Sequence, residues 1–177
     1  VRSISVDKKI ASEWVEAESP VPTDFTPRSS ITQGGNIPGL MSSYIPFTFN
    51  VQRTNKTTEP QTIYNYITFP PMPSIGFPAP GVGPEEIRIG SETGPLAGTI
   101  NPGVPANTGF IVPVTFAPNE LGKDFTVYIK FGNFPAQLVN PDIALQVNQG
   151  IPQREELNRG NNFKVYHNSI SILPSLF

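Results

Sequence analysis

Apolar residues alternate with polar residues or tyrosines in three stretches of the chain, 43–52, 61–69 and 123–131. Successive side chains of a β-strand point to opposite faces, so this period of two predicts three strands, each with one buried and one wetter face. The apolar phase of these strands should line the core. The predicted core residues are Phe47, Phe49, Ile63, Ile67, Phe125, Val127, Ile129 and Phe131.

Prolines and glycines separate the remaining apolar runs, since the 177 residues include 21 Pro and 15 Gly. Short β-branched and aromatic runs between such turn signals are typical of an all-β fold. Further strands are predicted at 2–6, 85–90, 96–100, 108–117, 143–147 and 162–173. We therefore predict a single β-barrel domain over 1–177: an all-β, eight- or nine-stranded single jelly roll or β-sandwich, with at most one or two short helices.

The N-terminal region departs from the strand pattern. Val6, Ile10 and Trp14 recur every fourth residue, which favours a short helix over 7–18, with a strand as the alternative. We interpret 1–20 as a possible N-terminal arm outside the barrel.

Two other segments are rich in proline and glycine. The segment 19–39 is expected to be irregular. The long loop 70–84 contains six prolines and three glycines, yet Met72, Ile75 and Phe77 make it too apolar for a free linker. Such a loop is either a contact loop or a cover over one end of the barrel.

Two prolines, Pro46 and Pro113, lie inside predicted strands. Proline has no N–H for a β-ladder, so each should lie on an edge strand, at a bulge, or where its nitrogen faces outward. In 162–173 the apolar phase slips by one residue after Phe163 and Val165, which predicts a bulge or a change of sheet.

The charge balance excludes some classes of partner. Twelve basic and fourteen acidic residues give a net charge of −2, whereas nucleic-acid binding needs a basic patch, so no nucleic-acid partner is predicted. Charged residues make up only 15% of the chain, below the roughly 25% of typical soluble domains. Such a weakly charged surface suits permanent contact with other protein.

No residue pattern points to catalysis. Cysteine is absent, and the single histidine, His167, has no accompanying nucleophile motif. Glu85 and Glu86 are adjacent in a predicted strand, so their side chains should face opposite ways and cannot form a paired acid and base. We predict a protein that is not an enzyme, with no catalytic residue, no cofactor and no metal site.

The five tyrosines lie opposite the apolar phase of their strands, Tyr166 only relative to the residues before the slip. Three interpretations remain open: cross-strand packing on a half-solvated face, a protein interface, or a carbohydrate-binding face. The candidate interface residues are Tyr44, Tyr64, Tyr66, Met72, Ile75, Phe77, Tyr128 and Tyr166.

The cysteine-free chain lacks an apolar signal core at its start, has proline-punctuated strands such as Thr-Gly-Phe-Ile-Val-Pro-Val-Thr-Phe-Ala at 108–117, and has a strand-rich C-terminal region ending at Phe177. In these features it resembles the small major capsid proteins of tailless icosahedral phages with an internal membrane, which infect thermophilic bacteria. The resemblance implies a single jelly roll that assembles an icosahedral shell by self-association. It also implies contacts with a second capsid protein and with the membrane beneath the shell. The expected location is the virion capsid, after synthesis in the host cytoplasm.

A second class of function fits the same pattern. A secreted or tail-associated β-sandwich could instead be a binding module that recognises glycan or a host surface protein. A shell protein should self-associate and ignore sugars, whereas a binding module should be monomeric or trimeric and retain glycan.

Overall fold

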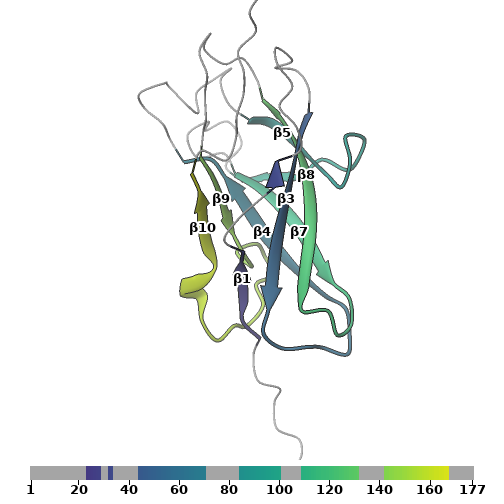
Figure 1. The fold of residues 1–177 in the computed structure, drawn as a ribbon, viewed down its shortest axis with the longest axis vertical. Coiled ribbons are helices and arrows are strands. Elements are labelled where there is room, and N and C mark those ends of the chain that lie inside the picture. Colours follow the sequence, from purple (N-terminus) through teal and green to yellow (C-terminus); the bar gives the residue numbers. More distant parts are fainter. Residues whose placement is uncertain are drawn as a thin grey trace, which may run out of the picture.

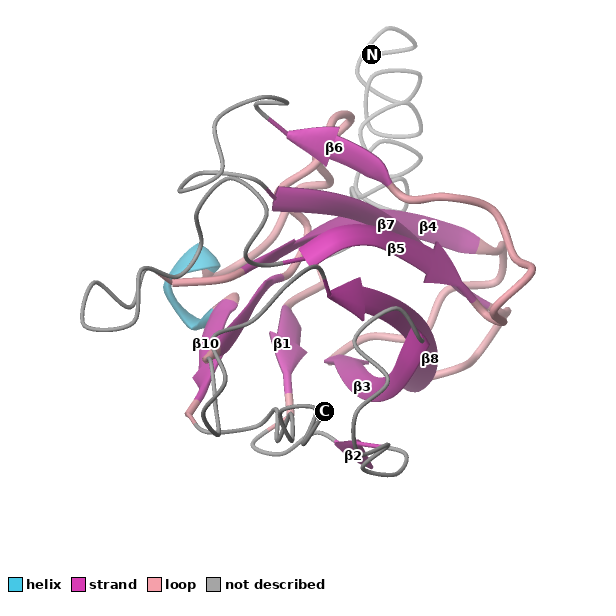
Figure 2. Ribbon diagram, turned by 90° about the horizontal axis from the view of Figure 1, so that it is seen from above, coloured by secondary structure: helices cyan, strands magenta, loops and turns pink. Residues whose placement is uncertain are grey.

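The alternating stretches form antiparallel strands of two sheets in the computed structural model, which describes residues 23–28, 32–33, 44–70, 84–100, 109–131 and 142–167 (Figure 1). Sheet A has the order β1 (Phe25–Pro27), β3 (Tyr44–Arg53), β8 (Gly122–Phe131), β5 (Pro84–Ile89), with β2 (Thr32–Gln33) also paired to β3. Sheet B has the order β10 (Phe163–Tyr166), β9 (Ile143–Gln146), β4 (Gln61–Thr68), β7 (Gly109–Phe116), β6 (Gly98–Ile100). Seen from above, β6, β7 and β4 lie on one side of the sandwich and β8, β3 and β2 on the other (Figure 2).

The chain winds between the two sheets in a nested order. β3 pairs with β8, and β4 pairs with β7, so in the sequence the second pair lies between the two strands of the first. From β3 to β6, each successive strand belongs to the other sheet. The strands β3-β8-β5 and β4-β7-β6 therefore follow the winding of a jelly roll. The all-β two-sheet prediction is confirmed. The described residues form ten strands, or nine without the two-residue β2.

Most predicted strands occur near their predicted bounds, but the segment 19–39 was misjudged. It was expected to be irregular, yet it contains β1 and β2, which pair with β3. Both are too short to show a period of two. The predictions for 1–20, including the helix over 7–18, lie outside the described residues, as do 71–83 and the end of the predicted last strand.

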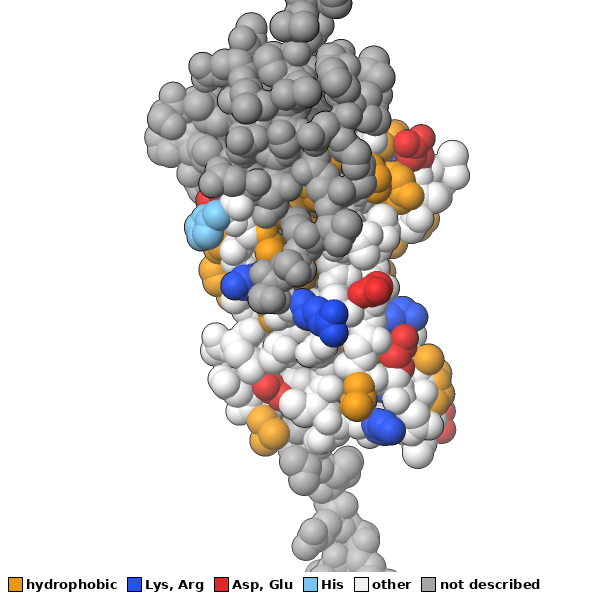
Figure 3. All heavy atoms as spheres, viewed as in Figure 1, with side chains coloured by type: hydrophobic (Ala, Val, Ile, Leu, Met, Phe, Trp, Pro, Cys, Tyr) orange, Lys and Arg blue, Asp and Glu red, His pale blue; other side chains and the backbone are white. Residues whose placement is uncertain are grey.

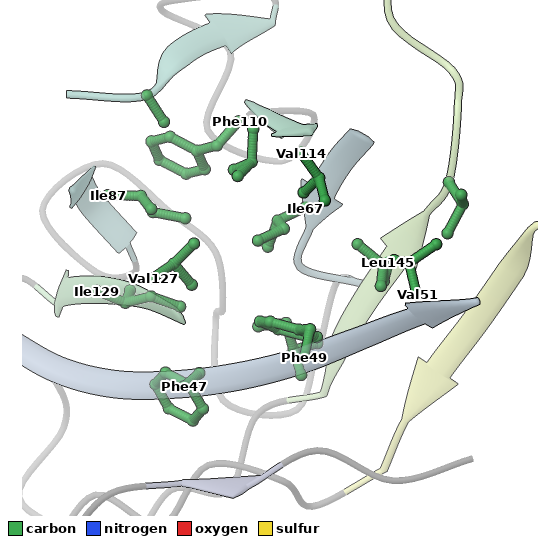
Figure 4. Close-up of a cluster of buried hydrophobic side chains, with 14 of the residues drawn as sticks. Phe47, Phe49, Val51, Ile67, Ile87, Phe110, Val114, Val127, Ile129 and Leu145 are labelled. Carbon is green, nitrogen blue, oxygen red and sulfur yellow. The ribbon is translucent and has the colours of Figure 1, made fainter. Parts of the chain in front are cut away.

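The apolar phase of β3, β4, β5, β7 and β8 points between the sheets (Figure 4). Of the predicted core, Phe47, Phe49, Ile63, Ile67, Val127 and Ile129 are fully buried. Phe125 is only partly buried, and its ring stacks on Phe49 at 5.4 Å between centroids. The side chain of Phe131 lies outside the described residues. The strands not used for that prediction contribute further fully buried side chains, which include Phe25, Ile87, Phe110, Phe116, Ile143 and Leu145.

A buried arginine ties together two connections at one end of the sandwich. Arg53, at the end of β3, is 4% exposed, and its guanidinium lies 4.8 Å from the ring centre of Phe116. It donates hydrogen bonds to the carbonyl oxygens of Glu120 and Ala117, at 2.6 and 3.1 Å, and to the hydroxyl of Thr57 at 2.9 Å. Burial lowers the pKa of Arg53, and the nearby charge of Glu120 acts in the opposite direction. The β3–β4 and β7–β8 connections are thereby joined.

Backbone hydrogen bonds close the side of the sandwich at β5 and β6. The N–H of Ile89 donates to the carbonyl of Pro95 at 2.9 Å, and the N–H of Ala97 donates to the carbonyl of Ile87 at 2.8 Å. Between them Leu96 forms a β-bridge with β5. We call this pairing of 95–97 with β5 the backbone seam. It covers the free edge of sheet A just before the chain enters sheet B.

Side chains close the opposite side, between β1 and the C-terminal part of sheet B. One carboxylate oxygen of Glu156 accepts a hydrogen bond from the N–H of Phe25 at 3.0 Å. The other accepts from the amide groups of Asn148, at 2.7 Å, and Asn162, at 2.6 Å. Both asparagines are buried. A carboxylate that accepts three N–H donors is well satisfied and holds three separate segments together.

Tyr166 of β10 makes the second link on this side. Its hydroxyl donates to the carbonyl of Arg28, just after β1, at 2.7 Å, and its ring packs edge-on against Phe49. We call the contacts of Glu156 and Tyr166 with 25–28 the side-chain seam. β1 is therefore fixed to sheet A by backbone pairing, to β10 of sheet B by Tyr166, and to the β9–β10 connection by Glu156.

Candidate interaction surfaces

The outward side of sheet B carries no charged residue at its strand positions, and we call it the uncharged face. Register assigns to it the residues on the side of β4, β6, β7, β9 and β10 that points away from the core. They are Thr62, Tyr64, Tyr66, Thr68, Gly98, Ile100, Gly109, Ile111, Pro113, Thr115, Ala144, Gln146, Phe163 and Val165. Two of them, Gly109 and Ala144, are nevertheless buried. Phe163 is 54% exposed, which is unusual for so large an apolar side chain.

Tyr64 and Tyr66 lie on the uncharged face as predicted, and both are half-buried. Part of their cover comes from their own chain. Gly150 donates its N–H to the carbonyl of Tyr64 at 2.9 Å. A Cβ at Gly150 would lie 2.4 Å from the Cβ of Tyr64 and 3.4 Å from the Tyr66 ring, so only glycine fits there. Ile151, the next residue, is 88% exposed beside them.

Pro113 meets the prediction for a proline in a strand. It is exposed, faces outward and lies opposite Tyr64 of β4. On the other side of β7, β6 pairs only with residues 109–111. Pro113 therefore lies in a stretch of β7 whose outer edge has no partner strand among the described residues. Pro46 is opposite Tyr128 of β8, and the pairing of β2 with β3 begins one residue further on.

The outward side of sheet A differs, because Glu86, Arg88, Asp124 and Lys130 alternate there with uncharged residues. We call it the charged face; its uncharged residues on β3 and β8 are Tyr44, Pro46, Thr48, Asn50, Gln52, Gly122, Thr126 and Tyr128. Acidic and basic side chains are interspersed over this side of the molecule in Figure 3.

Tyr44 belongs to a polar cluster on the charged face. Its hydroxyl donates to the carboxylate of Glu86 and accepts from the Nε of Arg88 at 2.8 Å. Arg88 also pairs with Glu86 at 3.5 Å and donates to the carbonyl of Gly94 at 3.0 Å. Tyr128 is half-buried in the neighbouring row, opposite Arg88. These contacts fit the cross-strand interpretation of Tyr44 at least as well as an interface.

The sequence predicts an outward orientation for Tyr166, and this orientation is wrong. Tyr166 is 4% exposed and part of the core, whereas Phe163 of the same strand points outward. Alternation with Phe163 and Val165 predicts the opposite orientation, but β10 lies at the edge of sheet B, where its outward side is also apolar. Burial raises the pKa of Tyr166 to about 12 because it disfavours the charged phenolate. Met72, Ile75 and Phe77 lie outside the described residues.

His167 follows β10 and is exposed. Its Nδ1 lies 2.9 Å from a carboxylate oxygen of Asp142, which precedes β9. Within the described ranges, no three His, Cys, Asp or Glu residues gather as metal ligands would. The described residues also contain no helix long and apolar enough to cross a membrane.

Sequence reasoning missed a buried polar cluster. Asn65, on the inward side of β4, is fully buried and accepts a hydrogen bond from the N–H of Asn148 at 3.0 Å. Asn148 in turn bonds Glu156, which also holds Asn162. One signal was present: Asn65 interrupts the apolar phase between Ile63 and Ile67. Its partners, more than 80 positions away, carry no comparable signal.

Comparison with known proteins finds no match among family models, curated proteins or solved structures. Function is therefore argued from the fold and the two outer faces.

Proposed function

We propose that this protein is a viral coat subunit that assembles a shell by self-association, with other coat subunits as further partners. The supporting observation is a jelly-roll-wound sandwich in which the outward side of the described strands of sheet B carries only uncharged residues, several of them aromatic or aliphatic. The largest apolar patch on the surface of a soluble protein is often functional, and such patches with polar rims often mark interaction sites. A shell subunit needs complementary surfaces on a rigid scaffold.

The test is the assembly state of the purified chain. Size-exclusion chromatography with light scattering, run over a range of salt and protein concentrations, should show oligomers that grow with concentration. Electron microscopy of the largest species should show closed shells or regular fragments. A chain that remains monomeric at millimolar concentration would contradict the proposal.

The competing function, a glycan- or host-binding module, has support of its own in the cluster of Tyr44, Glu86 and Arg88, since polar groups beside an aromatic ring suit sugar recognition. A glycan array separates the two functions. Retention of a glycan by a monomeric or trimeric chain, lost in Tyr44→Ala, would favour the binding module.

A further inference from the structure

We infer that the uncharged face binds the uncharged face of a second copy of the chain, in a face-to-face pair related by a two-fold axis. This inference rests on the proposed self-association and names the surface and the partner that it uses. An interface of this kind is isologous, because the same patch contributes from both copies.

Charge selects this partner over the other face of the same protein. Packing the uncharged face against the charged face would take Glu86, Arg88, Asp124 and Lys130 out of water without new partners, which is costly. Packing two uncharged faces together removes no ionised strand residue from water. The nearest charge bonded to the face is Arg154 at its rim, whose Nε donates to the carbonyl of Thr62 at 2.8 Å and which is exposed.

The relief of the uncharged face also suits such a contact. Register places Phe163, Gln146, Tyr66 and Ile111 in one row across four strands. Phe163 stands exposed at one end of that row, and Gly98 at the other end has no side chain. When the two-fold axis lies perpendicular to this row, the large end of one row faces the small end of the other, and the two rows can interdigitate.

The size of the face predicts a weak pair. Strands about 4.8 Å apart with about 3.4 Å per residue give the described strands of sheet B a footprint of roughly 400 Å². Two such faces bury roughly 800 Å² by this measure, somewhat below the roughly 1,000 Å² expected of a specific interface. We therefore expect that this contact alone gives a dimer that dissociates on dilution. The dimer becomes stable only when other contacts between the same copies add to it.

The experiment introduces opposite charges at one position of the face. Ile111 is half-buried and outward on β7, so Ile111→Lys and Ile111→Glu are made in the full chain. Thr126→Lys and Thr126→Glu, outward in the middle of β8 on the charged face, are the matched controls. Circular dichroism and melting confirm that each variant is folded. Sedimentation velocity then measures self-association of each variant and of equimolar mixtures.

Each Ile111 variant alone should weaken self-association by about tenfold or more. Each copy brings an unpaired charge into the uncharged contact, and the two like charges lie on either side of the two-fold axis, about two strand spacings (roughly 10 Å) apart along the row. The Lys and Glu variants mixed together should regain it, and about 1 M salt should abolish that recovery by screening. The Thr126 variants should behave as the unmodified chain does.

Three outcomes would overturn the inference in distinguishable ways. If both Ile111 variants associate normally, the face is not used. If both fail and the mixture does not recover, the face binds some other surface of the copy, so self-association stands but the face-to-face pair does not. If the unmodified chain never associates, the proposed function fails with it.

Discussion

The backbone seam and the side-chain seam both close a side of the sandwich, but the first uses main-chain hydrogen bonds and the second uses side chains. At the backbone seam, 95–97 pairs with β5 through main-chain groups, so the side chain of Leu96 stays 55% exposed. At the side-chain seam, Glu156 and Tyr166 reach across to 25–28. Main-chain pairing depends little on residue identity, whereas a side-chain link depends on one particular residue. The two sides should therefore differ sharply in their tolerance of substitution.

The largest effect is expected from the apolar anchor of the side-chain seam. Phe25 is fully buried and packs against Phe116 at 5.9 Å between ring centres. Phe25→Ala should lower the free energy of unfolding by about 3–5 kcal/mol, measured by urea denaturation. A loss below about 1 kcal/mol would mean that β1 adds little to the fold.

Removing the central carboxylate should have the next largest effect. Glu156→Ala leaves the amides of Asn148 and Asn162 and the N–H of Phe25 without their acceptor, so we expect a loss of about 3 kcal/mol. The matched control is Glu155→Ala, since Glu155 is exposed and should change stability by less than about 0.5 kcal/mol. Equal losses of stability in the two variants would mean that Glu156 does not hold the seam together.

The hydroxyl of Tyr166 should contribute less. Tyr166→Phe keeps the ring on Phe49 and removes only the bond to the carbonyl of Arg28, so the expected loss is about 1 kcal/mol. A double-mutant comparison with Glu156→Ala shows whether the two links act together. Additive losses would mean that the links hold β1 independently.

The same hydroxyl predicts a pH dependence. In the unfolded chain a tyrosine ionises near its ordinary pKa of 10.0, whereas folding raises the pKa of Tyr166 to about 12. The folded state then binds the proton more tightly, so this stabilisation is complete below pH 10.0 and is lost as the pH rises toward about 12. The stability difference between the unmodified chain and Tyr166→Phe should shrink over that window. A difference that stays constant would show that Tyr166 ionises normally.

The smallest effect belongs to the backbone seam. Leu96→Ala removes an exposed side chain and leaves the N–H of Ala97 bonded to Ile87, so stability should change by less than about 0.5 kcal/mol. A loss comparable to that of Glu156→Ala would erase the contrast between the seams.

This contrast also explains what the sequence could predict. The alternation of apolar and polar residues predicted the positions of β3, β4 and β8. It also predicted that Phe49 and Ile129 point inward, because it indicates which side of a strand is buried. It could not find the side-chain seam, since Phe25 and Glu156 lie 131 positions apart and neither belongs to a periodic stretch. It also failed at β10, an edge strand whose two sides are both partly apolar. For the same reason the predicted orientation of the tyrosines is right for Tyr64 and Tyr66, which face outward, and wrong for Tyr166, which is buried.

Pro113 also affects how the unfolded chain can associate with other chains. The strand Gly-Phe-Ile-Val-Pro-Val-Thr-Phe that forms β7 is apolar, uncharged and rich in β-branched residues. Apart from its proline it has the composition of segments that stack into amyloid-like fibrils. A proline in its middle interrupts such stacking. The native sandwich tolerates it because the pairing of β6 with β7 reaches only Ile111. A proline at such a position is the kind of residue that keeps an apolar β-rich segment from stacking on other chains before it has folded.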